Sequence, residues 1–293
     1  MTILKKLDGK VSVIVPVYNR EKYLENSVLT AVNLPEVSEV ILIDDGSKDN
    51  SLNLCINLEN KFEKIKVVVH DNNANKGTSA SRNVGIKHAS APFIAFLDSD
   101  DIYHPNRFKK ALKILNNDET VDGVYDSYSV RFENGMEDIR GIRDNIPYDK
   151  LFEELIAGKK GRFHTNTITV KKEVFSKSGF FNEDLRLQED VELWLRLAWH
   201  CKLVPGNLEE PVATVIRHGE NLMQNTNFQS KIKYYESSLN YFKNKKISFY
   251  SYWLMWLKLV KFRFRNKNIA QFISGFMFND LFFLFHIQNK KVK

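Results

Sequence analysis

A short apolar segment that runs directly into three carboxylates is the feature that most constrains the fold of this chain. Residues 93–97 are apolar without interruption, and Asp98, Asp100 and Asp101 follow them. An apolar run of this length is typical of a strand buried on both faces of a parallel sheet. Ligands of open α/β sheets bind at the carboxyl ends of such strands. We therefore expect a binding site here, in which Mg²⁺ or Mn²⁺ relieves the repulsion between the carboxylates.

A simpler interpretation of this acidic segment is a solvated turn that caps a helix starting near Pro105. The preceding sequence favours the binding site. Segments rich in β-branched residues occur at 11–18, 39–44 and 65–70, and each is followed by a helical pattern. Strands that alternate with helices predict a parallel sheet with right-handed crossovers. We therefore expect an α/β fold with a mainly parallel central sheet flanked by helices.

Asn19 follows the first expected strand, and its side chain is suited to cap the helix after it. In the second half of the chain the alternation is weaker. An acidic pair, Glu189 and Asp190, precedes a strong helical pattern that includes Trp194. Around this helix we expect a strand over residues 123–130, a loop over 131–147, a helix over 151–157, a strand over 165–170, one or two short strands within 203–216, and helices from residue 230 onward.

The length and composition are those of a globular protein with a substantial core. The 293 residues are 43% hydrophobic and 27% charged, which suits one large domain or two coupled domains. The two cysteines, Cys55 and Cys201, lack metal-ligand spacing and do not indicate a disulfide framework. Residues 1–9 lack the apolar core of a signal peptide, and no apolar run has the length of a membrane-spanning helix. We therefore expect a cytoplasmic protein.

Positive charge is concentrated at the C-terminal end of the chain. Residues 231–293 contain 13 Lys and Arg but only Glu236 and Asp280 as acids, a net charge of +11. The preceding residues carry a net charge of −4, so the overall charge of +7 belongs to this tail. Such asymmetry points to an anionic partner, a membrane or a nucleic acid. The aromatic residues of the tail leave two interpretations open: helices packed on the catalytic part or on a second subunit, and interfacial helices on an anionic membrane.

Two further polar segments lie where chemistry is expected. Asp44 and Asp45 end the second strand, where a carboxylate could accept a hydrogen bond from a uracil ring or a ribose, although Asp-Gly-Ser is also a common turn. Gly77 allows close backbone approach, and Arg82 could contact a base or a phosphate or form a surface ion pair. The chain has no Walker loop and no G-x-G-x-x-G. These absences argue against a P-loop ATPase and a dinucleotide dehydrogenase.

In combination and in order, four segments resemble the family 2 inverting glycosyltransferases. They are residues 11–19 (VSVIVPVYN), 44–47 (DDGS), 75–83 (NKGTSASRN) and 98–101 (DSDD). The resemblance covers roughly residues 10–220 and implies the GT-A fold. It divides the chain into a nucleotide-sugar half (1–130) and an acceptor half (131–229), followed here by a basic, aromatic helical extension (230–293). It implies metal-dependent transfer of a sugar, from a UDP-linked donor, to a saccharide or lipid-linked saccharide in bacterial cell-surface glycan synthesis.

The resemblance also implies roles for individual residues. Asp190 matches the catalytic base, and Glu189 remains its rival. The cation, Mn²⁺ or Mg²⁺, would be held by Asp100 and Asp101. His218, in a segment that matches more loosely, would lie near the donor diphosphate and the metal. The residues on the nucleotide side are Pro16, Tyr18, Asp44, Asp45, Arg82, Asp98, Ser99 and Asp100.

Two other functions are compatible with parts of the sequence. A sugar-phosphate nucleotidyltransferase shares the sheet type, but it needs a Gly-rich basic loop after the first strand, where this chain has residues 16–20 (PVYNR). A non-catalytic protein could use the basic tail on nucleic acid, and salt-dependent retention of DNA or RNA would detect it. The resemblance favours the transferase over both.

Overall fold

The computed structural model describes residues 10–218 and 228–265. Its main sheet has seven strands in the order β10-β6-β9-β4-β1-β2-β3. The neighbours β1–β2, β2–β3, β1–β4 and β10–β6 pair in parallel, whereas β9 is antiparallel to β4 and β6. The expectation of a mainly parallel sheet is confirmed. The strands are β1 (Val11–Val17), β2 (Val37–Asp44), β3 (Ile65–Val69), β4 (Phe93–Phe96), β6 (Gly123–Tyr125), β9 (Ile168–Lys171) and β10 (Leu203–Pro205).

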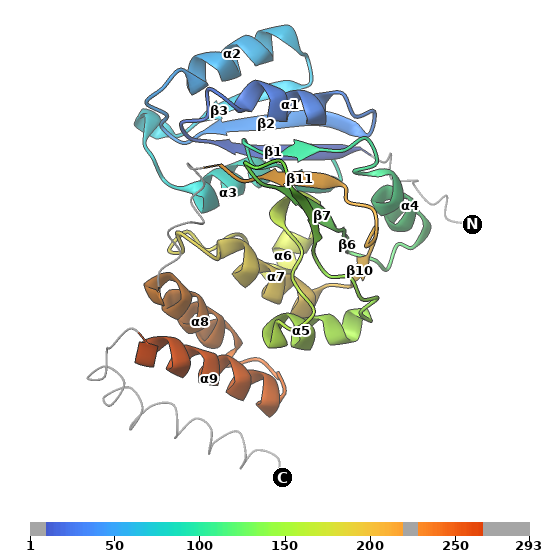
Figure 1. Cartoon of the computed structure of the whole chain (residues 1–293), viewed down its shortest axis with the longest axis vertical. Coiled ribbons are helices and arrows are strands. Elements are labelled where there is room, and N and C mark those ends of the chain that lie inside the picture. Colours follow the sequence, from blue (N-terminus) through green and yellow to red (C-terminus); the bar gives the residue numbers. More distant parts are fainter. Residues whose placement is uncertain (1–9, 219–227, 266–293) are drawn as a thin grey trace.

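Helices cover both faces of this sheet (Figure 1). Alternate residues of β1 point to opposite faces, so Val13 and Val15 join one hydrophobic cluster and Ile14 joins the other. The first cluster includes the apolar faces of α1, α2 and α4, and the second includes those of α3, α5, α6 and α7. The helices are α1 (Leu24–Val32), α2 (Ser51–Lys61), α3 (Thr78–His88), α4 (Lys109–Asn117), α5 (Tyr148–Ala157), α6 (Val174–Ser178) and α7 (Glu189–His200).

A second, four-stranded sheet has the order β5-β11-β7-β8. Its strands are β5 (Ile102–Tyr103), β11 (Ala213–Ile216), β7 (Tyr128–Arg131) and β8 (Glu137–Arg140). The prediction of one strand over residues 123–130 was wrong, because the chain changes sheets at Asp126 and Ser127. Asn207 holds this break, since its N–H donates to Asp126 Oδ1 (2.6 Å) and its carbonyl accepts from the Ser127 N–H (2.7 Å). The predicted loop over 131–147 contains β8, whose residues are all exposed and therefore give no apolar pattern.

Asn19 does not cap the first helix. The helix α1 begins five residues later at Leu24, and Tyr23 occupies the capping position. Asn19 instead has a positive φ of 53°, accepts a hydrogen bond from the Lys48 N–H (2.7 Å) and donates its own N–H to Ser47 Oγ (3.2 Å). It therefore fixes the end of β1 to the turn after β2. Likewise, the strand expected over 165–170 begins with a 3₁₀ turn, Thr165–Thr167, ahead of β9.

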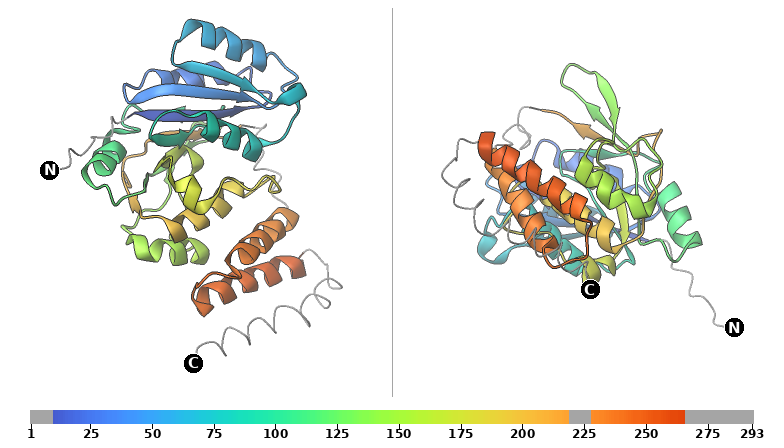
Figure 2. Two further views of the ribbon diagram at one scale, coloured as in Figure 1. Left: turned by 180° about the vertical axis from the view of Figure 1, so that it is seen from behind. Right: turned by 90° about the horizontal axis from the view of Figure 1, so that it is seen from below.

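Two C-terminal helices, α8 (Phe228–Phe242) and α9 (Phe249–Arg265), pack beneath α5 and α7 (Figures 1 and 2). Tyr234, Phe242 and Met255 are buried in the same cluster as Trp194. The Lys258 ammonium donates to two carbonyls at the C-terminal end of α5. Helices after residue 230 are thus confirmed up to residue 265, and 266–293 lie outside the described residues. Among the described helices, none combines the length and hydropathy needed to cross a bilayer.

We expect Met255→Ala to destabilise the whole domain, because Met255 is fully buried between the C-terminal helices and the rest of the core. Truncation of a buried Met to Ala costs roughly 2–5 kcal/mol of unfolding free energy. Urea unfolding measures this loss. Tyr250→Ala is the matched control, because Tyr250 lies on the same helix and is 61% exposed. Equal stability of both variants would contradict the packing described for α9.

Candidate functional site

The carboxyl ends of three neighbouring strands meet at one edge of the main sheet. Val17 pairs with Asp44 across β1 and β2, and Ile14 pairs with Phe96 across β1 and β4. The residues that follow these strands, Tyr18, Asp45 and Asp98, are therefore brought to the same edge. Of the residues predicted on the nucleotide side, Pro16 lies within β1, Ser99 is buried, and Tyr18 is 42% exposed.

The two aspartates after β2 are buried and are held by backbone N–H groups. Asp44 Oδ2 accepts from Gly46 and Ser47, both at 3.0 Å, which closes the turn. The Asp45 carboxylate accepts from the N–H groups of Lys76 (2.7 Å) and Gly77 (2.9 Å to Oδ2). Asp45 thus joins the end of β2 to the start of α3. Its predicted contact with a nucleotide stays a prediction.

Arg82 connects the two halves of the fold. Its side chain lies on α3 and is 4% exposed. One guanidinium nitrogen donates to Asp98 Oδ1 and another donates to Glu189 Oε1, both at 2.8 Å. Burial raises the pKa of Asp98, but Arg82, His164 and Arg20 together outweigh burial and keep this pKa below its ordinary value. Arg82 therefore links the carboxylate of Asp98, after β4, to the carboxylate of Glu189, at the start of α7.

Asp101 binds elements of the protein with both of its oxygens. Oδ1 accepts from the Ile216 N–H (2.8 Å) on β11, and Oδ2 accepts from the Asn166 side-chain amide (2.6 Å). The side chain is 2% exposed. Burial, together with the charges of Asp100 and Asp98, raises its pKa well above the ordinary value. Asp101 therefore connects the acidic turn, residues 98–101, to the segments that contain Ile216 and Asn166.

Asp100 has a different environment from Asp101. Its Oδ2 lies 3.3 Å from Arg20 Nε and 3.1 Å from His218 Nε2, and its side chain is 12% exposed. The His218 ring stacks on Tyr23, with centroids 4.4 Å apart and planes 17° apart. The structure thus brings together two of the residues predicted for the metal, Asp100 and His218. Arg20, which the sequence did not single out, lies beside them.

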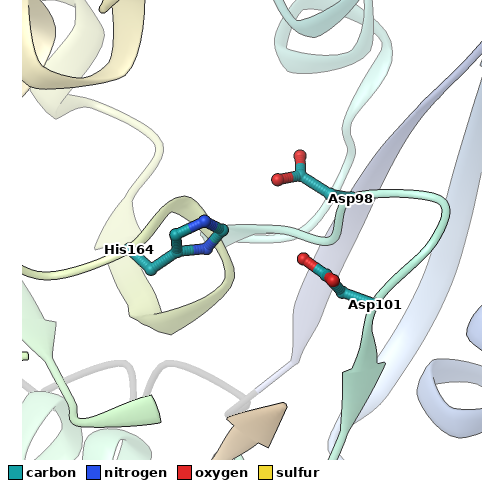
Figure 3. Close-up of side chains that lie close together, drawn as sticks. All are labelled: Asp98, Asp101 and His164. Atoms are coloured by element: carbon teal, nitrogen blue, oxygen red, sulfur yellow. The ribbon is translucent and has the colours of Figure 1, made fainter. Parts of the chain in front are cut away.

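His164 is a second residue that the sequence did not reveal. One ligand atom from each of Asp98, Asp101 and His164 lies within 4.8 Å of the others (Figure 3). His164 Nδ1 accepts from the Asn166 N–H (3.3 Å), so the neutral ring carries its proton on Nε2. Burial lowers the pKa of the ring. A lone histidine without a motif offered no signal for this placement.

The acidic pair at the start of α7 is divided between two environments. Glu189 points to Arg82, whereas Asp190 Oδ2 accepts from Thr165 Oγ1 at 3.4 Å. Asp190 Oδ1 accepts from the Val191 N–H at 2.7 Å. Burial raises the pKa of Glu189 to about 7, with the charge of Asp190 adding to the effect and Arg82 opposing it. Glu189 is therefore bound to a guanidinium, whereas Asp190 contacts Thr165 in the 3₁₀ turn ahead of β9.

The raised pKa of Glu189 makes a prediction about stability. Because the folded protein binds the Glu189 proton more tightly than the unfolded chain, this group stabilises the fold fully below pH 4.5, its ordinary pKa. The stabilisation is lost as the pH rises through about 7. Glu189→Gln mimics the protonated group. We expect the unfolding free energy of the wild type, relative to this variant, to fall by up to about 3 kcal/mol between pH 5 and pH 8. Urea unfolding at both pH values tests this, and a constant difference would contradict the raised pKa.

The family model described as Glycosyl transferase family 2 matches residues 12–179. A protein of Rickettsia conorii named as a glycosyltransferase is 30% identical over 206 residues, which cover 69% of this chain and 33% of the relative. One of Haemophilus influenzae is 29% identical over 231 residues, covering 76% and 75%. The minor teichoic acid biosynthesis protein GgaA of Bacillus subtilis is 33% identical over 199 residues, covering 61% and 41%. This chain spans about a third of the length of the relatives from Rickettsia felis and Rickettsia conorii.

Solved structures of S. aureus TarS share the fold. The structure of its residues 1–349 has a TM-score of 0.65 and 20% identity, and the likeness covers 90% of this chain and 74% of that one. The same part of TarS in complex with UDP-GlcNAc has a TM-score of 0.65 and 19% identity, covering 86% and 71%. The likeness shows that the mixed sheet and its flanking helices form the GT-A fold.

Proposed function

This chain belongs to glycosyl transferase family 2, and from that premise we propose that it transfers a sugar from a UDP-sugar donor to a saccharide or lipid-linked saccharide, with inversion at the anomeric carbon. The observation that supports the proposal is the single edge of the sheet at which Asp45, the acidic turn and the Glu189–Asp190 pair converge. The complex of TarS with UDP-GlcNAc supports a UDP-sugar as the donor. Cell-surface glycan synthesis is the proposed setting, in line with GgaA.

The donor lies, in this proposal, across the ends of β1, β2 and β4. The exposed Tyr18 ring offers a stacking surface for the base. Both carboxylate oxygens of Asp45 already accept from the N–H groups of Lys76 and Gly77, so Asp45 positions the turn that faces the uracil and the ribose. The acidic turn then receives the diphosphate together with the cation that neutralises it. Ligand binding at the carboxyl ends of the strands is the general rule for open α/β sheets.

Asp100 and His218 are the residues we propose for the cation. A carboxylate oxygen and an imidazole nitrogen 3.1 Å apart suit Mn²⁺, and the nitrogen suits Mg²⁺ less, because Mg²⁺ keeps to oxygen ligands. We had expected Asp101 as a second ligand. Because hydrogen-bond donors already contact both of its oxygens, we assign it a positioning role instead. A bound divalent cation would stabilise negative charge on the departing diphosphate.

Asp190 is the proposed catalytic base. An inverting transfer needs one carboxylate that takes the proton of the attacking hydroxyl on the face opposite the leaving group. Asp190 is the member of the acidic pair that faces Thr165 in the acceptor half, in the first turn of α7. Glu189 is the member that holds Arg82. We propose that Glu189 positions Arg82 and Asp98.

Thermal unfolding with a panel of nucleotides and nucleotide sugars tests this function without knowledge of the acceptor. We expect UDP or a UDP-sugar to raise the unfolding temperature in the presence of Mn²⁺ and to lose most of this effect in EDTA. At a hundred times the dissociation constant, a ligand that binds only the folded state adds about 2.7 kcal/mol. If no nucleotide shifts the transition, the proposed function fails. If the shift persists in EDTA, the metal assignment fails.

The C-terminal helices suggest where the enzyme works. Tyr250, Trp253 and Phe264 on α9 are exposed large side chains, and Lys261 and Arg265 on the same helix are also exposed. Exposed aromatic and basic side chains together favour binding to an anionic membrane surface. We propose peripheral attachment at the inner face of the cytoplasmic membrane.

Co-sedimentation with vesicles tests this attachment. We expect binding to vesicles that contain anionic lipid and no binding to neutral ones. The variant Tyr250→Ser/Trp253→Ser should lose most of this binding while it keeps nucleotide-dependent thermal stabilisation. Equal sedimentation with both kinds of vesicle would contradict the proposal.

A further inference from the structure

Arg20 lies beside the acidic turn, and hydrogen bonds hold both its backbone and its side chain. Its backbone N–H donates to Ser51 Oγ at the start of α2 (2.7 Å). Its Nη1 donates to the carbonyl of Asn19 (2.9 Å), the residue whose own side chain is held by the turn after β2. The guanidinium is therefore directed back over the end of β1 toward the acidic turn. Its side chain is only 15% exposed, so it is part of the site and not of the outer surface.

The guanidinium contacts the oxygen that the proposed cation needs. Arg20 Nε lies 3.3 Å from Asp100 Oδ2, and His218 Nε2 lies 3.1 Å from that same atom. A divalent cation at Asp100 would thus be repelled by the permanent positive charge of the Arg20 guanidinium. Like charges a few ångströms apart in a partly buried site repel strongly, so this repulsion is large enough to govern binding of the cation.

A donor diphosphate removes the repulsion between Arg20 and the cation, because its own negative charge attracts both. Guanidinium groups bind phosphate oxygens in a bidentate manner and remain charged at every relevant pH. Building on the function proposed above, we propose that Arg20 neutralises Asp100 in the donor-free enzyme and passes to the donor diphosphate when cation and donor enter together. Arg20 then binds the donor and makes cation binding depend on the nucleoside diphosphate. By linkage, the cation raises the affinity for the nucleotide by the same factor.

Isothermal titration of the full chain tests the proposal with two probes, Mn²⁺ alone and UDP in the presence of Mn²⁺. Arg20→Gln keeps a polar side chain but removes the charge. We expect it to bind Mn²⁺ alone at least about fivefold more tightly than the wild type and UDP with Mn²⁺ at least about fivefold more weakly, the low end of typical coupling factors. Arg20→Lys, which keeps the charge without the fork, should restore the weak binding of Mn²⁺ alone and only part of the UDP affinity.

Lys48→Gln is the matched control, because it removes the same charge from an exposed side chain on the neighbouring turn. It should leave both affinities unchanged. Thermal unfolding of every variant establishes that it is folded. If Arg20→Gln binds Mn²⁺ alone no more tightly than the wild type, the proposed competition at Asp100 is overturned. If the wild type itself fails to bind UDP with Mn²⁺, the proposed function fails, while the Mn²⁺ titration still decides the competition.

Discussion

Asp190→Asn should reduce turnover by roughly 10²-fold or more and leave UDP binding close to that of the wild type, because the amide cannot take the proton of the acceptor hydroxyl. The amide oxygen can still accept from the Val191 N–H, and the amide nitrogen can donate to Thr165 Oγ1, so the start of α7 should keep its structure. Initial rates of UDP release from the donor, together with UDP titration, measure the two effects separately.

Glu189→Gln is the control for that experiment, because Glu189 is the adjacent carboxylate. The variant removes the charge that faces Arg82, 2.8 Å away. We expect a smaller loss of turnover than for Asp190→Asn, accompanied by a change in UDP affinity. If Asp190→Asn is close to wild type and Glu189→Gln is inactive, the two roles must be exchanged.

Asp100→Ala and Asp101→Ala should fail in different ways, although the residues are adjacent. Asp100→Ala removes the proposed cation ligand, so Mn²⁺-dependent UDP binding and transfer should be lost while stability is nearly unchanged. Asp101→Ala leaves the Asn166 amide and the Ile216 N–H without their buried acceptor. Each such group costs about 1–3 kcal/mol. We therefore expect a clear loss of unfolding free energy for Asp101→Ala.

Urea unfolding and Mn²⁺ titration of both variants distinguish these outcomes. Asp101→Asn is a further control, because it keeps the volume but cannot satisfy two donors at once. It should lie between Asp101→Ala and the wild type in stability. If Asp101→Ala is as stable as the wild type and has lost Mn²⁺ binding, Asp101 is a metal ligand, as the sequence had led us to expect.

The structure of the first hundred residues could be predicted well, because it follows from patterns within short segments of the sequence. The strands β1, β2 and β4 are buried on both faces, so each appears as a mainly apolar run. In a parallel sheet their carboxyl ends must share one edge. The convergence of Tyr18, Asp45 and Asp98 therefore followed from the order of the segments alone.

The remainder depends on contacts that are distant in sequence. The change of sheet at Asp126 is hidden in a run with continuous β character, and it is held by Asn207, 81 residues away. The bond from Arg82 to Glu189 spans 107 residues, and that from Asp101 to Ile216 spans 115. Single residues outside any motif, such as Arg20 and His164, can be recognised as part of the site only when the fold brings such segments together.

The anomeric configuration of the first product tests the central claim most directly. The enzyme would be incubated with Mn²⁺ and a UDP-sugar of α configuration that stabilises it in the thermal experiment, and early ¹H NMR spectra would show the released or transferred sugar. The account predicts that the sugar first appears in the β configuration and that neither β sugar nor UDP forms in EDTA. First appearance of the α sugar, or full activity in EDTA, would contradict a metal-dependent inverting glycosyltransferase.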